Sequence, residues 1–517
     1  MNRKIVTFVV IAVIAVTGGF FWIKSRFDAQ VRQGIETFVA SIPAPCTMTI
    51  GKIDVDSFKR TVTLFDAETI CTSNNGEQKF SAKRVVAANV NMDAFKEGAG
   101  KTVLLKKLEL ADVAFMGPGL AGSMEYYRLE GIAGDMKIIW PAISRALPGL
   151  ALAYNRLDDL ETNKELQRKL MAAFVDVLRA YETVAIDTFE MRNYTYRLNA
   201  DDMPLSMTVR DVMGSKYALR DMGPIQLAGI SVTLGDTPVL SMESMGLEGA
   251  KLPSFVPLFE IAASGREPAL SEIQEVFKAK DFSLKNVYSK NMLVQDPRQP
   301  GQMICSLAES SFSYDGSAMH HAAIAWKDLS VNKALYTEGS GLSAGVLALI
   351  PDTVHVGGSF VVQAATKDKG FYDITWEAMV KEQALGSLLI KADVLNVHAM
   401  AVAMGSPGAA ALGSMTLLAT DTGISEILFT LAAEKEGVTA EEQRASVVRQ
   451  LSRSQGALPN DTIRNLAENI MKFLEKPGSS ITVSLKPESP LNALLLKQLF
   501  VADPVKLGLS VSLTPAQ

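Results

Sequence analysis

The sequence predicts a β-rich α+β protein, in which an N-terminal transmembrane helix precedes a long curved antiparallel sheet with covering helices and a C-terminal α+β unit. Most runs alternate apolar and polar residues, which is typical of antiparallel strands with one face in water. Helical spacing of apolar residues is confined to a few segments. Hydrophobic residues make up 48% of the chain and charged residues 21%, so most of it is expected to fold.

The chain has 517 residues, more than a typical domain of ~100 to 200 residues, so we expect more than one packing unit. We predict four parts: a tail and membrane anchor (1–28), a β-rich region (29–135), a repeated β-hairpin region with inserted helices (136–369) and an α+β unit (370–517). Lys and Arg (51) nearly balance Asp and Glu (56). Because phosphate backbones attract a basic excess that this chain lacks, nucleic acid is not an expected partner.

The segment Ile5–Ile23 has the properties of a membrane anchor. It carries no charge, and at ~1.5 Å per residue it nearly crosses a ~30 Å hydrocarbon core. Aromatic residues Phe20–Trp22 mark its far boundary, and no small-x-small cleavage site follows. Basic residues flank both ends, but long domains translocate largely regardless of charge. We therefore expect a single-pass bacterial inner-membrane protein with most of its chain in the periplasm.

Two strand-like runs near the N-terminus predict a hairpin, Thr47–Val55 and Val62–Ile70, with a tight turn near Phe58. In that register three pairs lie opposite one another: Val55 and Val62, Ile53 and Leu64, and Cys46 and Cys71. A disulfide between Cys46 and Cys71 would close the base of the hairpin and would suit an oxidising compartment. The alternative is two buried thiols that do not pair.

A few segments have the spacing of amphipathic helices. Ala29–Ser41 can form a short helix after the anchor. Apolar residues three or four apart from Leu166 to Tyr181 predict a longer helix, which Thr162 or Asn163 can cap. Leu270–Lys278 is expected to form another helix that covers the sheet.

The C-terminal part is expected to combine strands with two capped helices. Thr439 and Glu442 form a capping box, and Asp461 can cap the second helix. Strands are expected at Phe371–Trp376, Ser387–Val397, Gly413–Ala419, Ser480–Leu485 and Leu507–Leu513.

A short phrase recurs through the β regions: an apolar residue, any residue, then Asp, Gly or Asn, then an apolar residue. Its irregular spacing differs from that of a solenoid repeat. Asp, Asn and Gly favour a bend or bulge that re-aims a strand, so we expect one hairpin unit used repeatedly in a curving antiparallel sheet. The copies are Leu110–Val113, Leu129–Ile132, Val209–Val212, Leu219–Met222, Leu227–Ile230, Leu247–Ala250, Leu284–Val287 and Trp326–Leu329.

One motif has the spacing of a serine nucleophile elbow, Gly341-Leu-Ser343-Ala-Gly345. Asp393 and His398 could complete the order serine, acid, histidine. The residues before the motif are polar, however, and the chain lacks the alternating parallel strands and helices of an α/β-hydrolase. We expect a Gly/Ser loop and no enzyme, with a serine hydrolase using Ser343 as the remote alternative.

A second motif, Gly117-Pro-Gly119-Leu-Ala-Gly122, spells a dinucleotide fingerprint. The residues that follow it read as a strand, whereas the fingerprint requires a helix whose N-terminus holds pyrophosphate. We expect a loop between strands and no cofactor.

The chain has four histidines, and none belongs to a metal-binding motif: His320, His321, His355 and His398. Adjacent His320 and His321 would point to opposite faces of a strand, so they cannot chelate together. No metal site is expected. Cys305 is expected to be a small buried apolar residue.

The chain resembles the AsmA-like family of bacterial envelope proteins in its anchor, in the hairpin containing Val62-Thr-Leu-Phe-Asp-Ala67, in Ala82-Lys-Arg-Val-Val86 and in phrases such as Leu284-Lys-Asn-Val287. The resemblance implies an inner-membrane anchor and a groove-shaped periplasmic sheet with a role in phospholipid movement and outer-membrane homeostasis. The inserted helices and shorter body depart from the family pattern. The C-terminal phrases Asp421-Thr-Gly-Ile424 and Phe473–Gly478 resemble those of uncharacterised proteobacterial periplasmic proteins.

Two functional hypotheses follow for a chain without a dense polar cluster. The first is an envelope protein whose sheet presents an apolar groove to lipid acyl chains, with phospholipid and the membrane as partners. The 22 Met and 22 Phe residues would suit adaptable apolar contacts. The second is a periplasmic scaffold or assembly factor that binds other envelope proteins through sheet edges or helices.

Overall fold

The computed structural model describes most of the chain after residue 26. The described residues are 27–42, 46–56, 58–73, 76–95, 100–139, 141–142, 144–146, 163–199, 203–277, 282–316, 319–337, 342–367, 371–398, 410–456, 458, 460–492 and 506–515. The predicted anchor Ile5–Ile23 lies outside them. None of the helices within them has the length and hydropathy that a membrane span requires. Two compact units divide the chain, unit 1 (1–284) and unit 2 (285–517).

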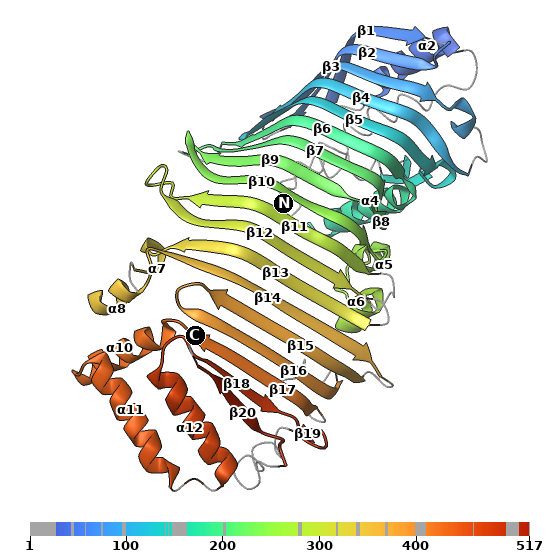
Figure 1. Ribbon diagram of the computed structural model, residues 1–517. Helices are drawn as coiled ribbons and strands as arrows, with labels where there is room; N and C mark the ends of the chain where they lie inside the picture. Colours follow the sequence, from blue (N-terminus) through green and yellow to red (C-terminus); the bar gives the residue numbers. More distant parts are fainter. Residues whose placement is uncertain are drawn as a thin grey trace. The chain divides into compact units, whose positions relative to one another are not determined.

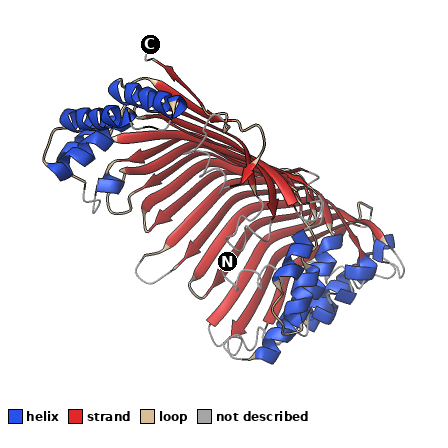
Figure 2. Cartoon of the chain, turned by 90° about the horizontal axis from the view of Figure 1, so that it is seen from below, coloured by secondary structure: helices blue, strands red, loops and turns tan. Residues whose placement is uncertain are grey.

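Unit 1 is a sheet whose helices lie along one side, near the strand ends (Figures 1 and 2). Its described helices are α2 (Phe27–Ser41), η1 (Met92–Phe95), α4 (Lys164–Thr183), α5 (Val256–Ala263) and α6 (Leu270–Phe277). Its described strands are β1 (Cys46–Asp56), β2 (Thr61–Ser73), β3 (Gly76–Val90), β4 (Lys101–Gly117), β5 (Leu120–Asp135), β6 (Ala185–Leu198), β7 (Leu205–Ala218), β8 (Asp221–Met222), β9 (Ile225–Leu234) and β10 (Thr237–Lys251).

The strands of unit 1 pair antiparallel in chain order. Each strand from β1 to β6 pairs with the next, β7 pairs with both β8 and β9, and these two pair with β10. This pairing confirms the β-rich, antiparallel α+β prediction for the unit. Because β8 and β9 share one position between β7 and β10 and the other connections link paired strands, the sheet is a simple meander.

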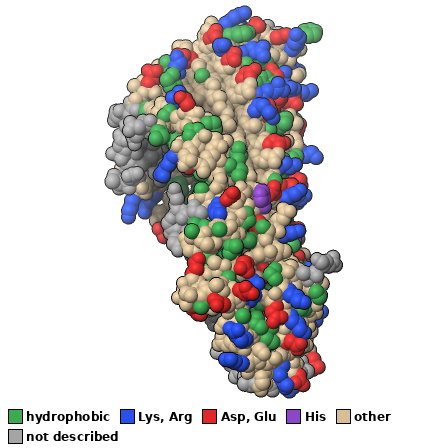
Figure 3. All heavy atoms as spheres, turned by 60° about the vertical axis from the view of Figure 1, so that its left-hand side comes forward, with side chains coloured by type: hydrophobic (Ala, Val, Ile, Leu, Met, Phe, Trp, Pro, Cys, Tyr) green, Lys and Arg blue, Asp and Glu red, His purple; other side chains and the backbone are tan. Residues whose placement is uncertain are grey.

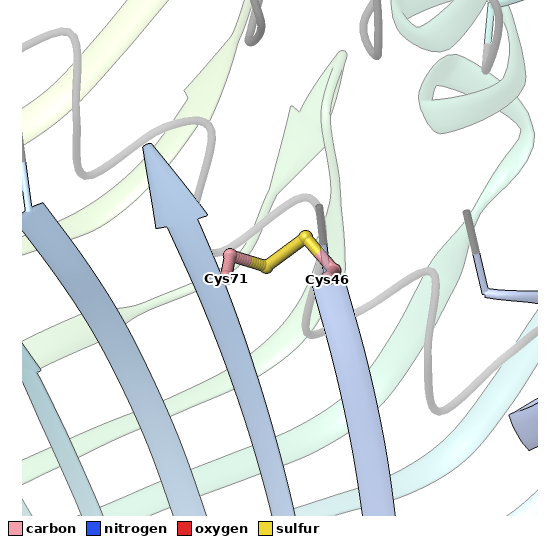
Figure 4. Close-up of a disulfide and its surroundings, with 2 residues drawn as sticks. All are labelled: Cys46 and Cys71. Atoms are coloured by element: carbon pink, nitrogen blue, oxygen red, sulfur yellow. A yellow bond between two sulfur atoms is a disulfide. The ribbon is translucent and has the colours of Figure 1, made fainter. Parts of the chain in front are cut away.

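The first hairpin has the predicted register. Three pairs lie opposite one another as expected: Val55 and Val62, Ile53 and Leu64, and Cys46 and Cys71. A disulfide joins Cys46 to Cys71 where β1 begins (Figure 4). The bridge therefore ties the edge strand β1 to β2 at the end of the ladder opposite the turn.

Two predicted helices of unit 1 form where the apolar spacing placed them. In α2, Val31 and Ile35 are buried against the core of the first four strands. In α4, the side chain of Asn163 accepts a hydrogen bond from the Leu166 N–H at 3.0 Å, so Asn163, one of the two predicted caps, caps the helix. The predicted helix Leu270–Lys278 corresponds to α6 (Leu270–Phe277), and Lys278 lies outside the described residues.

The repeated phrase forms a bend in most of its copies. In five copies the third residue has a positive φ, the left-handed region that Gly, Asn and Asp tolerate best: Asp112, Gly131, Gly229, Asn286 and Asp328. In three copies the third residue does not have a positive φ: Asp211, Asp221 and Gly249. The predicted bend is thus confirmed for the first group. In the second group, Leu219–Met222 lies at the turn between β7 and β8, whereas no positive φ bends the copies at Asp211 and Gly249.

In unit 1 the residues with positive φ, including several outside the repeated phrase, form two rows of bends. Each row crosses the sheet and has a bend on every second strand. The first row contains Asp66 on β2, Asp112 on β4, Asn193 on β6 and Gly229 on β9. The second row contains Asn89 on β3, Gly131 on β5 and Lys216 on β7. The printed registers align the members of each row, with one residue of an unbent strand between them.

Lys216, in the second row, has a φ of 52°, and a lysine side chain disfavours this left-handed backbone conformation. A non-Gly residue in the left-handed region costs roughly 1 kcal/mol. Lys216→Gly should therefore raise the free energy of unfolding by up to about 1 kcal/mol. The measurement is hydrogen exchange of peptides from β7 across a urea series, which gives the urea concentration at the unfolding midpoint. The neighbouring change Ser215→Gly, at a position without positive φ, should lower the midpoint; a rise for both variants would contradict the argument.

Unit 2 combines antiparallel strands with helices (Figure 1). Its described strands are β11 (Ser283–Gln295), β12 (Met303–Asp315), β13 (Met319–Asn332), β14 (Thr353–Thr366), β15 (Phe371–Glu382), β16 (Gly386–His398), β17 (Ala411–Asp421), β18 (Ser480–Leu485), β19 (Leu491–Asn492) and β20 (Ser510–Thr514). Its described helices are α7 (Ala334–Thr337), α8 (Ala344–Leu349), α10 (Ile424–Glu436), α11 (Ala440–Gln455) and α12 (Asp461–Glu475).

The sheet of unit 2 runs without a break past residue 370, where the sequence suggested a boundary. Strands β12 to β17 pair antiparallel in chain order, β17 pairs with both β18 and β19, and β18 pairs with β20. On the two sides of residue 370, Thr366 of β14 pairs with Tyr372 of β15. The compact units instead divide at 284/285.

The C-terminal helices begin at side-chain caps. The predicted capping box is present: Thr439 and Glu442 each bond to the other's backbone N–H. The cap of α12 is Asn460, whose side chain accepts from the Ile463 N–H at 3.0 Å, and the prediction that Asp461 is the cap is wrong by one residue. Asp461 instead occupies the first turn, where a carboxylate favours the helix dipole.

The two C-terminal phrases that the sequence singled out lie side by side. The buried Asp421 accepts two backbone hydrogen bonds at the start of α10, from Gly423 and Ser425, both at 3.1 Å. Its own backbone bonds to Gly478 and Ser479, which follow α12. The two phrases therefore form one hydrogen-bonded junction between the end of β17 and the start of β18.

Candidate functional site

The unit 1 apolar face is formed by two lines of side chains that flank the first row of bends. In each strand that the row crosses, bent or not, two apolar residues three positions apart lie on either side of the row. One line contains Leu64, Val85, Leu110, Tyr127, Met191, Val212 and Leu227. The other contains Ala67, Ala82, Val113, Met124, Tyr194, Val209 and Ile230. A strand that bends between them turns both side chains to the same face, where they pack in common hydrophobic clusters.

Many of the residues between these lines are charged or polar, and several pair across strands. Lys83 lies 3.5 Å from Asp112 on the next strand, and the Asn193 amide donates to Glu125. The guanidinium of Arg192 lies over the Tyr126 ring, 5.7 Å from its centre. The two faces of the unit 1 sheet therefore differ in polarity, as the sequence alternation predicted.

Half-buried Met and aromatic side chains dominate the unit 1 apolar face from β5 to β10. Phe189, Met191, Tyr194, Met207 and Met242 surround a small buried centre, Val209, Val212 and Ile230. Thioether and aromatic side chains adapt to ligands of irregular shape. Burial raises the pKa of Tyr127 to about 12, so its hydroxyl stays protonated and adds no charge to the face.

The unit 2 apolar strip is a second apolar face, and it is more exposed than the first. It consists of two adjoining rows that cross β13 to β17: Ile324, Phe360, Ala378, Ile390 and Leu417, and beside them Trp326, Gly358, Val380, Leu388 and Ala419. Four of its large side chains are 40–44% exposed, namely Ile324, Phe360, Val380 and Leu388. Space-filling atoms show hydrophobic side chains reaching the molecular surface in patches (Figure 3).

The opposite face of the same strands combines polar pairs with apolar residues, among them Met379, which is 39% exposed. Lys391 forms an ion pair with Glu377 at 2.6 Å on the adjacent strand. Asp393 accepts hydrogen bonds from Thr375 at 2.8 Å and from Ser414 at 2.6 Å. Ile324, Phe360, Val380 and Leu388 lie together on one face in adjoining rows, so they form a contiguous exposed surface and are not scattered exceptions.

Aromatic rings lie across glycines on both apolar faces. Trp326 pairs with Gly358, and a Cβ built on this glycine would fall 2.3 Å from the indole ring. Phe189 covers Gly214 in the same way in unit 1, where a Cβ would fall 2.2 Å from the ring. The missing side chain lets each ring lie flat on the neighbouring strand, which keeps the apolar surface smooth.

Ser343 has a structural role in the described geometry. It caps α8: its hydroxyl accepts from the Val346 N–H at 3.1 Å and donates to Glu434 of α10. This is the arrangement of a helix cap, and within the described residues Ser343 contacts no histidine.

The other members of the proposed serine order lie in different settings. Asp393 is held by Thr375 and Ser414, and the His398 ring packs edge-on against Phe371 with centres 4.8 Å apart. The described hydrogen bonds therefore do not connect Ser343, Asp393 and His398, which only their order in the sequence suggested as a triad.

The glycine motif at Gly117–Gly122 is a hairpin turn, as predicted. Gly117 at the end of β4 pairs with Leu120 at the start of β5, and Gly119 between them has φ 71°. A strand follows the motif where a dinucleotide site would need a helix. The motif is explained by the turn.

The histidines have separate partners. His355 Nδ1 lies 2.8 Å from both Asp328 Oδ1 and Ser330 Oγ, and the hydrogen bond with His355 lowers the pKa of Asp328. Both partners use the same ring nitrogen, so this is not a catalytic triad, in which acid and serine use opposite nitrogens. Across the described part of the chain no three metal-ligating side chains form a group.

Comparison with known proteins places one match in unit 2. A family model described as "Uncharacterized protein" matches residues 377–514, which begin within β15 and end with β20. The match includes the end of the unit 2 apolar strip on β15 to β17 and the three C-terminal helices. No curated protein matches the sequence.

Proposed function

We propose that this chain is a non-enzymatic envelope protein, anchored in the bacterial inner membrane by Ile5–Ile23, whose apolar sheet faces hold lipid acyl chains in the periplasm. In this role it would contribute to lipid transport or outer-membrane homeostasis. The observation that carries the proposal is the unit 2 apolar strip. Four of its large side chains are 40–44% exposed, whereas polar residues of the opposite face are held in an ion pair and hydrogen bonds.

Acyl chains suit this strip on energetic grounds. Burying a methylene group contributes ~0.8 kcal/mol, so a sixteen-carbon chain half-buried along the strip would gain roughly 6 kcal/mol. Contiguous exposed apolar surface of this kind commonly marks an interaction site. The disulfide in unit 1 agrees with a periplasmic location, since disulfides persist in oxidising compartments.

Site-specific photocrosslinking in cells tests the proposal. Benzoylphenylalanine replaces Phe360, an exposed residue of the strip, in the full-length chain. The matched control replaces Val361, which pairs with Ala323 and Glu377 and lies on the opposite face. We expect irradiation to yield a phospholipid adduct, identified by mass spectrometry, at position 360 and at least tenfold less at position 361.

The same experiment separates the lipid proposal from the scaffold alternative. A protein adduct of defined mass at position 360, with no lipid, would favour an assembly factor. Equal lipid labelling at positions 360 and 361 would show that the strip has no special affinity and would defeat the proposal.

A further inference from the structure

A polar aromatic cluster lies at one end of the unit 2 apolar strip. The Tyr314 hydroxyl lies 3.3 Å from His320 Nδ1, and the His320 ring lies beside the Tyr372 ring with centres 6.0 Å apart. The three residues come from β12, β13 and β15. Strand alternation puts them on the same face as Ile324, Phe360 and Trp376.

We propose that the Tyr314–His320–Tyr372 cluster binds the phosphate of a glycerophospholipid whose acyl chains lie on the unit 2 apolar strip. This inference rests on the proposed function and adds the class of headgroup. The Tyr314 hydroxyl and His320 Nδ1 share one hydrogen bond, so this pair keeps one further donor and the Tyr372 hydroxyl supplies a second, whereas a phosphodiester offers acceptors only. Burial raises the pKa of Tyr314, which keeps its hydroxyl protonated as a donor.

The opposite end of the strip has the wrong charge for a phosphate. There Glu382 is buried, and its carboxylate accepts hydrogen bonds from the backbone N–H groups of His355 and Leu385. A phosphate would meet this carboxylate with unfavourable charge. Near the cluster, Asp373 alternates onto the other face and is ion-paired with Lys367 at 2.6 Å, so it does not oppose an anion in the same way.

Two soluble lipids with identical chains test the inference: dioctanoylphosphatidylglycerol and dioctanoylglycerol. Binding to the full-length, detergent-purified chain is followed by the fluorescence of Trp326 and Trp376, in a background where Trp22→Phe and Trp140→Phe remove the other tryptophans. We expect the phosphate lipid to bind about tenfold more tightly, as for a hydrogen bond to a charged group.

Variants then test whether the cluster causes the tighter binding of the phosphate lipid. His320→Leu should reduce the preference to about twofold or less and leave the dioctanoylglycerol affinity unchanged, and Tyr372→Phe should give a smaller loss in the same direction. The matched control is His321→Leu, because His321 pairs with Asp315 and Gln363 on the opposite face and should keep the full preference.

The outcomes distinguish this inference from the proposed function. Equal affinity for the two lipids, or a preference that survives His320→Leu, would overturn the headgroup site while leaving acyl-chain binding intact. Binding of neither lipid would overturn both.

Discussion

Replacing Cys46 and Cys71 together by alanine should lower the free energy of unfolding of unit 1 by about 3 kcal/mol. The disulfide joins residues 25 positions apart, and it restricts the unfolded chain by closing a loop of that length. It also fastens β1, which pairs with β2 and lies at the edge of the unit 1 ladder. The measurement is hydrogen exchange across a urea series, read on peptides from β1 to β3.

Three controls accompany this prediction. Peptides from β14 to β16 provide an internal reference, because they belong to unit 2 and should keep their midpoint. Reduction of the wild-type protein should reproduce the shift, and Cys305→Ala should not, since Cys305 is a free thiol. An unchanged midpoint for β1 to β3 would mean that the bridge contributes nothing to the stability of the hairpin.

Val31→Asp should destabilise the attachment of α2 to the sheet by roughly 4 kcal/mol or more. Val31 is fully buried and belongs to the same core cluster as Ile53 and Val62 of the first hairpin. The variant loses the burial of an apolar side chain and places a carboxylate in surroundings that cannot solvate it. Limited proteolysis of α2 should accelerate by at least a hundredfold if α2 opens before cleavage.

The matched control for Val31→Asp is Gln33→Asp on the exposed side of the same helix. It introduces the same charge with no loss of packing, so its cleavage rate should stay within about twofold of wild type. Similar rates for the two variants would show that α2 is held by something other than this apolar contact.

The first hairpin could be predicted because its physical determinants are local. The alternation of β1 and β2 fixes which side chains face the core, and a one-residue slip would turn them all to water. The caps of α4 and α11 were equally local, since Asn163 and Thr439 bond within three residues. Asp461 failed as a cap because Asn460, one residue earlier, offers the same chemistry in extended backbone.

The bends were predicted only in part because positive φ depends on the neighbouring strand. Val209–Val212 carries the phrase, but the positive φ in this row belongs to Asn193 on β6 and Gly229 on β9, the strands on either side. Lys216 bends with no Asp, Asn or Gly at all. The apolar spacing can be read from each strand alone. Which of two neighbouring strands carries the bend depends on how the strands pair in the folded sheet.

The candidate site required tertiary information. Ile324, Phe360 and Leu388 come from three separate strands, and their adjacency depends on registers set by the intervening turns. The alternation showed that one face would be apolar, but it could not show how much of that face stays exposed. The motif at Ser343 was expected to be a Gly/Ser loop, but the sequence did not indicate that Ser343 caps α8.

The alternating rows of bends also determine how a sheet of this kind can change its length during evolution. Because the bends of unit 1 recur on every second strand, the geometric period is a hairpin and not a single strand. Gaining or losing a whole hairpin leaves both rows in line. Gaining one strand would place two strands with bends in the same row next to each other. Related proteins should therefore differ by an even number of strands.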